Sequence, residues 1–336
     1  MKHSIGRIAL NYAKTLIFPI LMYGCFALLN LCVSGSTFFS DVITKNILLN
    51  AILNTIVAMA ISIPLSQGRW DYGCGTIATL GGIISVQIGM ALHLNLFLLI
   101  LLCCAICICL ALIEALIYIL LRVSTMIVSL GVVMIYEALT NILFEGKGVN
   151  LFQADLEYSS QITKFYQLPW ALIVLFVCMA IVYFILYKTK IGADVKSIGA
   201  NSKLAINSGV NEKKNIIVVY IICGALLGVA GLMNACNAQI ASASNLSSTS
   251  LMFSSMGGVL IGLFLANYSN LPWGMFLGCI GMSAMSYGLS AMGIDSSLVT
   301  IITGAVIVAI TAYTSNKSKI DEAFSGIFKR KAKEND

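Results

Sequence analysis

The sequence predicts an all-α polytopic membrane protein with about ten transmembrane helices and with both termini in the cytoplasm. Three observations predict this fold. Only 10% of the 336 residues are charged, whereas a soluble globular domain carries roughly 25%. Several runs of 20 residues or more contain no charge, and about 20 apolar residues can cross the hydrocarbon core as a helix. Basic residues are also divided unevenly between the alternate connections of these runs.

The first five helices are expected near residues 25, 56, 83, 107 and 133. The first two lie in the charge-free runs Thr15–Ser40 and Asn46–Gly68. Basic residues precede the first run, as in a signal peptide, but the run is long enough to span and lacks a small-residue cleavage site, so we expect a retained helix. The third is short and broken by glycine, and the fourth and fifth contain one charge each, Glu114 and Glu137.

The last five helices are expected near residues 178, 225, 257, 280 and 305. The sixth, seventh and tenth lie in the charge-free runs Leu168–Tyr187, Ile216–Ala235 and Ser296–Ser315. Glycine pairs four residues apart mark the seventh, eighth and ninth: Gly224 and Gly228, Gly258 and Gly262, and Gly274 and Gly278. Such pairs let helices approach closely in a bilayer, so they predict a tight bundle. The third and ninth helices have the least defined boundaries.

The distribution of basic residues sets the orientation. With the N-terminus inside, ten helices leave seventeen of the 20 Lys and Arg residues in cytoplasmic segments and three, Lys45, Lys147 and Lys164, outside. Positive charge favours the cytoplasmic side of a membrane. Removing one helix would reverse every later connection, so an even number is expected. The net charge of +6 therefore indicates a lipid bilayer, and not nucleic acid, as the partner of these residues.

Residues that carry catalysis or hold metals are sparse. The histidines are His3 and His93, and the sequence contains neither a G-x-x-x-x-G-K-[ST] loop nor an HExxH motif. The eleven cysteines fall almost entirely within predicted helices, where Cys behaves as a small hydrophobic residue. Cys104 and Cys107 share a helix face but have no histidine nearby to complete a metal site. We expect no catalytic residue, no metal site and no directly bound cofactor.

One basic segment, Lys188–Asn215, separates two long apolar runs and carries 6 of the 20 Lys and Arg residues. Gly199 is expected to loosen the chain there. Asn201 and Ser202 can then cap a short helix, and Gly209 suits the position after it, where φ is positive. Such a helix would offer Lys203, Leu204, Ala205 and Ile206 for docking into a groove on another protein. The alternative is an ordinary cytoplasmic loop that follows the positive-inside rule.

A glycine-rich stretch, "LSQGRWDYGCGT" over residues 65–76, lies between the second and third helices. Gly68 and Gly75 allow non-helical backbone, which at membrane depth is tolerated only against protein or a water-filled cavity. Arg69 and Asp71 are spaced for an exposed ion pair, which would contribute little stability. The alternative is a simple cytoplasmic turn.

Polar residues that can line a path across the membrane occur in two further places. Asn50 and Asn54 are four residues apart on the second helix, where they either join a neighbouring helix or face a polar path. The uncharged stretch Asn234–Ser250 is rich in hydroxyl and amide groups and includes Asn237 and Gln239. These groups match a neutral polyol better than an ion, although an ordinary outer loop has a similar composition.

The two glutamates inside predicted helices are functional candidates by default. Glu137 has Asn141 one helical turn away, and Glu114 precedes Arg122 by two turns. Both glutamates are either structural or coupled to an ion gradient.

Taken together, these stretches resemble the ribose-type sugar permease subunits of ATP-binding-cassette importers, from about Asn46 to Tyr313. "GRWDYGCG" resembles the family signature Gly-x-apolar-Asp-x-Ser-x-Gly, with Gly68, Asp71 and Gly75 kept and Gly73 in the place of the serine. "IGADVKSIGANSKLAINSGVN" is similar to the loop that docks on the ATPase. "STMIVSLGVVMIYEAL" and "CGALLGVAGLMNA" also resemble family segments.

The resemblance implies a function and a set of partners. It implies a path for a monosaccharide such as ribose or galactose, in a bacterial cytoplasmic membrane. A cytoplasmic ATP-binding subunit would use ATP, and an extracytoplasmic sugar-binding protein would deliver the solute. A second permease subunit is implied, in a homodimer or a divergent heterodimer. A divergent heterodimer is an alternative because "IGLFLANYSNLPWG" keeps Gly262 and Gly274 but lacks most glycines of the corresponding family segment.

The expected organisation is a permease domain over residues 1–315, with a coupling loop over 188–215, followed by a basic cytoplasmic tail over 316–336. Expected path residues are Asn54, Asp71, Glu137, Asn141, Asn237 and Gln239. Two alternatives to a sugar permease remain. One is a permease for branched-chain amino acids or nucleosides from the same superfamily, and the other is an ion-coupled secondary transporter that uses Glu114 or Glu137 and needs no ATPase.

Overall fold

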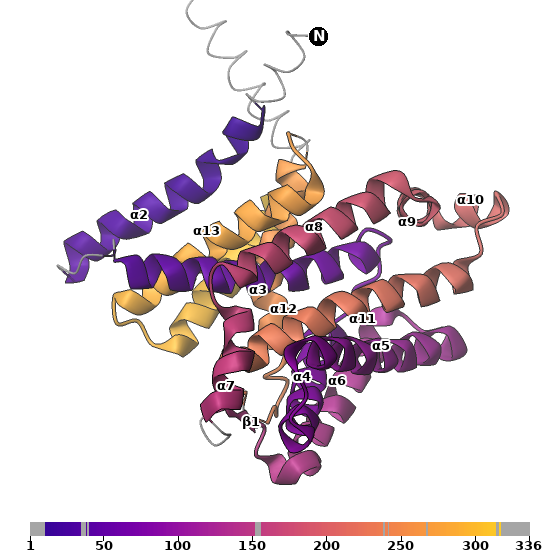
Figure 1. Ribbon diagram of the computed structural model, residues 1–336. Coiled ribbons are helices and arrows are strands. Elements are labelled where there is room, and N and C mark those ends of the chain that lie inside the picture. Colours follow the sequence, from indigo (N-terminus) through magenta and orange to yellow (C-terminus); the bar gives the residue numbers. More distant parts are fainter. Residues whose placement is uncertain are drawn as a thin grey trace, which may run out of the picture.

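The computed structural model describes residues 11–34, 38, 40–151, 156–237, 239–240, 242–266, 268–313 and 316. A helix lies at each of the ten predicted positions (Figure 1). These helices are α2 (Ile17–Ser34), α3 (Asp41–Leu65), α4 (Gly73–Leu92), α5 (Leu96–Leu121), α6 (Thr125–Ile142), α8 (Trp170–Lys188), α11 (Glu212–Cys236), α12 (Thr249–Leu265), α13 (Leu271–Ala291) and a last helix over Ser296–Tyr313. The all-helical fold class is confirmed. The predicted cytoplasmic tail over 317–336 and the first ten residues lie outside the described residues.

Eight helices in the described part of the chain are long and apolar enough to cross a membrane. The protein is therefore a multi-pass membrane protein. The two remaining helices are α12, with 17 residues, and α13, with 21. Glycine and serine lower the mean hydropathy of α13. These small residues suit a helix that packs against other helices over most of its surface.

Short elements fill two of the connections. Between α6 and α8 lie η1 (Leu143–Gly146), β1 (Val149–Asn150), α7 (Leu156–Thr163) and η3 (Lys164–Tyr166). Strand β1 pairs antiparallel with β2 (Gln239–Ile240), which follows α11. Between α8 and α11 lie α9 (Lys190–Ala200) and α10 (Ser202–Asn207). The pairing of β1 with β2 joins two connections that are predicted to lie on the same outer side.

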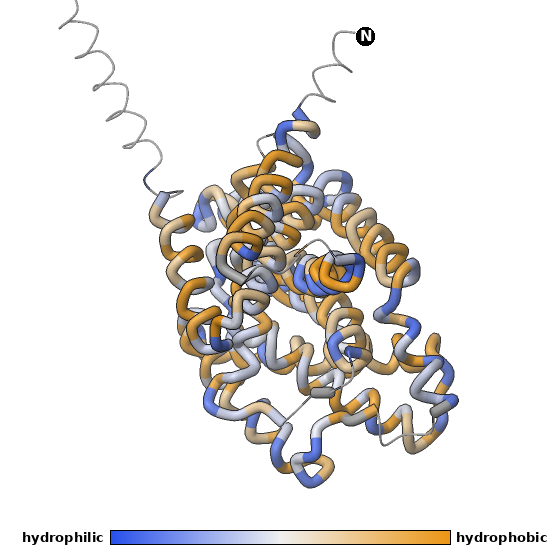
Figure 2. Tube along the Cα trace, turned by 90° about the vertical axis from the view of Figure 1, so that its left-hand side faces the viewer, coloured by the Kyte–Doolittle hydropathy of each residue, from blue (hydrophilic) through white to orange (hydrophobic). Residues whose placement is uncertain are grey.

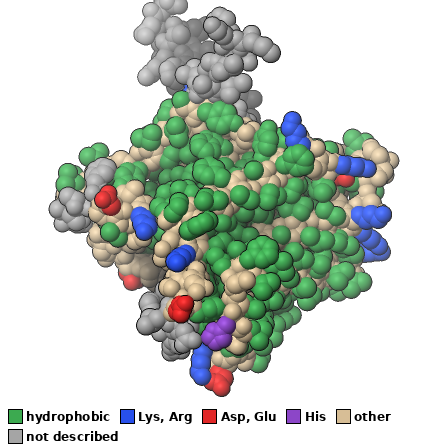
Figure 3. All heavy atoms as spheres, in the orientation of Figure 1, with side chains coloured by type: hydrophobic (Ala, Val, Ile, Leu, Met, Phe, Trp, Pro, Cys, Tyr) green, Lys and Arg blue, Asp and Glu red, His purple; other side chains and the backbone are tan. Residues whose placement is uncertain are grey.

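The bundle has a buried centre and an apolar periphery. In the most apolar part of α3, 89% of the residues are buried, compared with 22% for α2 and for α5. The outer helices expose large apolar side chains, such as Leu120 of α5 and Ile142 of α6. Much of the helical trace in Figure 2 has the colour of hydrophobic residues, and hydrophobic side chains occupy the middle of the face in Figure 3. This surface suits contact with lipid chains.

The predicted glycine pairs lie where helices touch. A Cβ on Gly274 would lie 2.8 Å from the carbonyl oxygen of Gly262, and one on Gly278 would lie 2.8 Å from that of Gly258. The backbones of α12 and α13 therefore meet through both pairs. The prediction of a tight bundle is confirmed at this contact, where close backbone approach replaces the hydrophobic force that is missing between helices in lipid.

Helix α9 is a feature that the sequence does not predict. The expectation of a loosened chain at Gly199 is wrong, because Gly199 lies near the end of α9. A Cβ at this position would lie 2.0 Å from the carbonyl oxygen of Ser66. Gly199 therefore lets α9 pack against the chain that leaves α3.

Candidate functional site

The chain between β2 and α12 turns back into the bundle and ends on a buried serine. Ser248 donates two hydrogen bonds to Oε1 of Glu137 on α6, from its backbone N (2.9 Å) and its Oγ (2.6 Å). Its Oγ also lies 2.6 Å from Oγ1 of Thr76 on α4. A Cβ on Gly75 would lie 2.4 Å from the Ser248 carbonyl oxygen. Ser248 thus joins α4, α6 and α12.

Glu137 is buried, and donors just before α12 form hydrogen bonds with its carboxylate. Besides the two bonds from Ser248, the backbone N of Leu246 donates to Oε2 at 2.8 Å. The side chain is 4% exposed. Backbone N–H groups just before and within the first turn of a helix lack intrahelical partners and favour a negative charge. The three donors therefore satisfy this carboxylate within the protein.

The depth of this contact follows from helix geometry. Glu137 lies about 18 Å along α6 from Thr125 and about 8 Å from Ile142, at 1.5 Å per residue, so the contact falls within the apolar length of a helix that can cross the membrane. Residues 242–248 are not helical. Irregular backbone is tolerated at this depth because it is buried in protein or lines a polar cavity.

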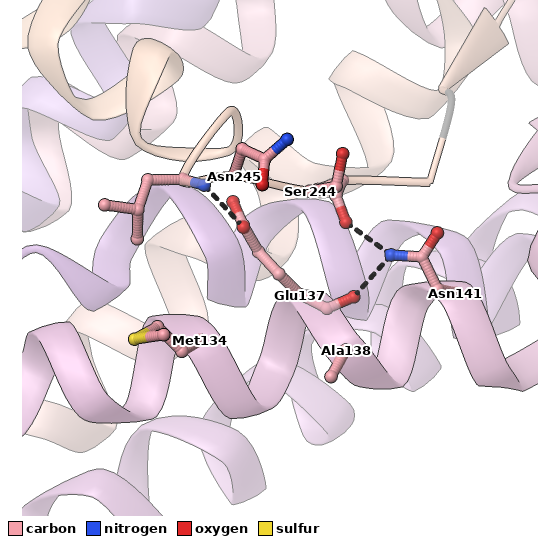
Figure 4. Close-up of a pocket in the computed structure, with 8 residues that line it drawn as sticks. Met134, Glu137, Ala138, Asn141, Ser244 and Asn245 are labelled. Carbon is pink, nitrogen blue, oxygen red and sulfur yellow. Dashed lines mark hydrogen bonds between the residues drawn. The ribbon is translucent and has the colours of Figure 1, made fainter.

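A pocket of about 250 Å³ lies beside this contact (Figure 4). Its wall is formed by one side of α6 and by the returning chain: Met134, Glu137, Ala138, Asn141, Ala243, Ser244, Asn245 and Leu246. The Asn141 amide donates to the Ala243 carbonyl at 2.6 Å. With Glu137 already satisfied by backbone and serine donors, the groups left to meet a solute are neutral amides, a hydroxyl, backbone and the apolar side chains of the lining.

The other predicted path residues lie apart from this pocket. Asn54 on α3 accepts hydrogen bonds from Ser254 (3.2 Å) and Ser255 (3.3 Å), and donates to Asn50 at 2.7 Å. It therefore joins α3 to α12. Asn237 is exposed at the end of α11, and the side chain of Gln239 in β2 is outside the described ones.

Ser248 and Thr76 are the site residues that the sequence misses. Thr76 directly follows Gly75 of the signature, and Ser248 belongs to the uncharged stretch before the eighth helix. Composition marks both regions as polar. No local spacing, however, indicates that they meet Glu137.

Arg69 and Asp71, in the turn 66–72, are buried, contrary to the expected exposed pair. Arg69 is 6% exposed and Asp71 is 4% exposed. Arg69 instead forms an ion pair with Glu212 at the start of α11 (Nη2 to Oε1, 2.9 Å) and donates to Gln67. The Asp71 Oδ1 accepts from the backbone N of Gly73 at 2.7 Å. Arg69 and Asp71 do not pair with each other because each has another partner. Asp71 binds an unpaired N–H group at the start of α4, and Arg69 binds a carboxylate of α11.

Helix α10 has the predicted local structure. The Asn201 side chain accepts from the Leu204 backbone N at 3.1 Å, and Gly209 has φ +93°. Leu204 is 64% exposed and Ile206 is 41% exposed, whereas Ala205 is buried. The apolar surface of α10 is therefore formed by Leu204 and Ile206, and Ala205 faces the protein.

Basic side chains gather around α10. The lysines of the basic segment are all exposed: Lys188, Lys190, Lys196, Lys203, Lys213 and Lys214. In Figure 3, Lys and Arg side chains lie at the edge where Figure 1 places α9, α10 and the start of α11. Helix α10 thus presents two apolar side chains to solvent at one end of the bundle, and basic side chains surround them.

Comparison with known proteins identifies the family. Residues 43–311 match the family described as "Branched-chain amino acid transport system / permease component". The chain is 24% identical to the ribose import permease of Escherichia coli over 301 residues, covering 87% of this chain and 92% of that protein. It is 24% identical to the galactose/methyl galactoside import permease of Haemophilus influenzae over 300 residues, covering 84% and 88%.

A third relative is the L-arabinose transport system permease of Escherichia coli, 23% identical over 230 residues, with 68% of each chain covered. A solved ABC transporter in an inward-facing conformation is 17% identical, with a TM-score of 0.49, and covers 90% of this chain and 99% of its own. The family assignment rests on the sequence matches and not on that structure.

Proposed function

The chain belongs to the family of permease components of branched-chain amino acid transport systems, and from this membership we propose a specific role. It is the membrane subunit of an ATP-binding-cassette importer for a monosaccharide, in a bacterial cytoplasmic membrane. The observation that carries the proposal is the similarity, over most of both chains, to permeases named for ribose and galactose.

The pocket beside Glu137 supports a neutral solute. A zwitterionic amino acid would need a free charge for each of its ionised groups, because burying an unpaired charge is costly. Glu137 accepts three hydrogen bonds from protein groups, and the remaining lining residues are neutral. Hydroxyl and amide groups exchange donors and acceptors with a polyol. The branched-chain amino acid alternative is therefore disfavoured.

The energy for transport comes from a separate subunit. The sequence lacks a phosphate-binding loop, and α10 offers Leu204 and Ile206 at the basic, cytoplasmic end of the bundle. An apolar pair on a short capped helix suits a groove on a soluble ATPase. The outer connections joined by β1 and β2 would receive the extracytoplasmic binding protein, and a second permease subunit completes the path.

A continuous series of contacts supports coupling between α10 and the pocket. Helix α11 follows α10 and holds Arg69 through Glu212. The turn 66–72 leads directly into α4, whose Gly75 and Thr76 contact Ser248. Movement of α10 would thus reach the returning chain that lines the pocket.

Reconstituted transport tests the proposal. Proteoliposomes containing this chain, its ATPase and its second permease subunit receive a binding protein loaded with ribose, galactose or arabinose. We expect ATP-dependent uptake of at least one of these sugars and none of leucine or a nucleoside. Uptake of leucine or a nucleoside instead would assign a different solute.

A second arm uses the chain alone under a proton or sodium gradient, without nucleotide. We expect no accumulation of solute in these vesicles. Accumulation there would establish the ion-coupled alternative and remove the need for an ATPase.

A further inference from the structure

Two carboxyl groups meet at the start of α4, away from the pocket. Asp71 lies in the turn 66–72, and Glu114 lies on α5. The two residues are 4% and 1% exposed, and both carboxyl groups lie against Gly73, whose backbone N donates to Asp71. Gly73 provides the space, because a Cβ there would lie 2.3 Å from one oxygen of Glu114 and 2.8 Å from the other.

The two carboxyl groups have unequal sets of partners. Asp71 accepts from the Gly73 backbone N at 2.7 Å, and Tyr220 of α11 lies near its carboxyl group. Neither oxygen of Glu114 receives a hydrogen bond from an N–H or hydroxyl donor in the described residues. The group within its reach is Asp71, and a carboxyl group can donate only when it carries a proton.

Two ionised carboxylates in contact would repel each other and lose their hydration. No cation on the described chain offsets this cost, because Arg69 pairs with Glu212 and Gln67. The described residues also contain no cluster of three side chains that could hold a metal ion. One proton resolves the conflict, since neutral Glu114 donates to Asp71 and both groups are then satisfied.

We propose that Asp71 and Glu114 form a proton-binding site, in which one proton carried by Glu114 fastens the turn 66–72 to α5. The turn has a second attachment to α11 through Arg69 and Glu212. Loss of the proton would remove this attachment to α5, leaving the turn held by the contact of the Arg69 guanidinium with the Tyr118 ring of α5 and by its attachment to α11. The site therefore acts as a pH-sensitive latch at the start of α4.

Among the described residues, the titratable groups around the pair do not take over the proton's role. The titratable groups facing the pair are Cys74 on α4, Tyr136 on α6, and Tyr220 and Cys223 on α11. Thiols and phenols are neutral near pH 7 and do not compensate a second carboxylate. Burial raises the pKa of the Asp71 carboxyl, in agreement with a pair that retains a proton.

The site lies close to the cytoplasmic end of the bundle. Glu114 is about 10 Å along α5 from Leu121, at 1.5 Å per residue. The cytoplasm is thus the nearer source of the proton. The latch requires no particular solute, so it can be tested on the purified full-length chain whatever the chain transports.

Infrared spectroscopy in H2O and D2O locates the proton. The wild-type chain at neutral pH should show the carbonyl stretch of a buried protonated carboxyl group. E114Q should lose this band, because its amide can donate to an ionised Asp71. D71N should keep the band at a shifted frequency, because Glu114 then donates to the asparagine oxygen. The exposed Glu145→Gln variant is the matched control and should leave the band unchanged.

Absence of the band in the wild type, or its persistence in E114Q, would overturn the proposal. Both variants are expected to fold, because each retains a donor and an acceptor in the pair. If E114Q fails to fold, D71N still decides through the retained and shifted band.

The pH dependence of stability is a second readout. In the unfolded chain carboxyl groups ionise near pH 4, whereas the proposed folded pair holds one proton, in agreement with the raised pKa of the Asp71 carboxyl. Folding then binds a proton, so stability falls as pH rises above that value, by about tenfold in the unfolding constant per pH unit for one proton. The apparent melting temperature should therefore drop more steeply between about pH 6 and pH 9 for the wild type than for E114Q. Equal slopes would contradict the shared proton.

Discussion

At the scale of single residues, Glu137 holds the returning chain against α6, within the length of that helix. In E137Q, one oxygen becomes an NH2 group that faces an N–H or hydroxyl donor instead of accepting from it. We expect a loss of about 1–3 kcal/mol, because a buried donor is left unsatisfied, together with reduced uptake. Thermal unfolding in detergent measures the first effect. The exposed Glu157→Gln on α7 is the control, and equal melting temperatures for the two variants would contradict this role.

Gly75 permits the close contact between α4 and Ser248. In G75A, the new Cβ would lie 2.4 Å from a backbone carbonyl oxygen, which cannot move as a flexible side chain does. We expect destabilisation of about 1–3 kcal/mol, as for other overpacked cores. Helical Gly131 of α6 has nothing within 4 Å of the built Cβ. G131A should therefore be neutral or slightly stabilising, and an equal loss in both variants would show that packing at Ser248 is not the cause.

At the scale of elements, the exposed side chains of α10 can be changed without affecting the packing of the bundle. Replacing Leu204 and Ile206 by Asp removes its exposed apolar surface without disturbing buried residues. We expect loss of co-purification with the ATPase and an unchanged melting temperature of the permease. N207D, which adds a charge to the same helix but keeps both apolar side chains, should retain the ATPase. Retention of the ATPase by the Leu204 and Ile206 double variant would exclude α10 as the docking element.

The elements also show how far a sequence can lead. Five of the helices are predictable because each lies in a charge-free run whose length matches a membrane span, and α10 is predictable because Asn201 and Gly209 are local signals. Helix α9 is not, since Gly192 and Gly199 lower its intrinsic helix propensity and its stability comes from packing against Ser66. The contact of Glu137 with Ser248 joins positions 111 residues apart. Only the fold brings such residues together.

At the scale of the whole molecule, the ion pair between Arg69 and Glu212 directly links the start of α11 to the turn before α4, beside the hydrogen bond from the Gln67 amide to Asn215. Arg69 is buried and Glu212 is partly exposed. E212Q should loosen this link while leaving α10 and its exposed side chains in place. We therefore expect the ATPase to remain bound and to hydrolyse ATP, while the amount of sugar taken up per ATP falls.

The measurement compares uptake with ATP hydrolysis in the same proteoliposomes. The matched control is E157Q, which neutralises an exposed glutamate on α7 and should leave the ratio unchanged. The charge-reversed pair R69E with E212R should recover part of the ratio, because the attraction between the two positions is restored. A normal ratio in E212Q would mean that the motion of α10 reaches the pocket without this ion pair, through the hydrogen bond of Gln67 with Asn215 or the contact of α9 with Ser66.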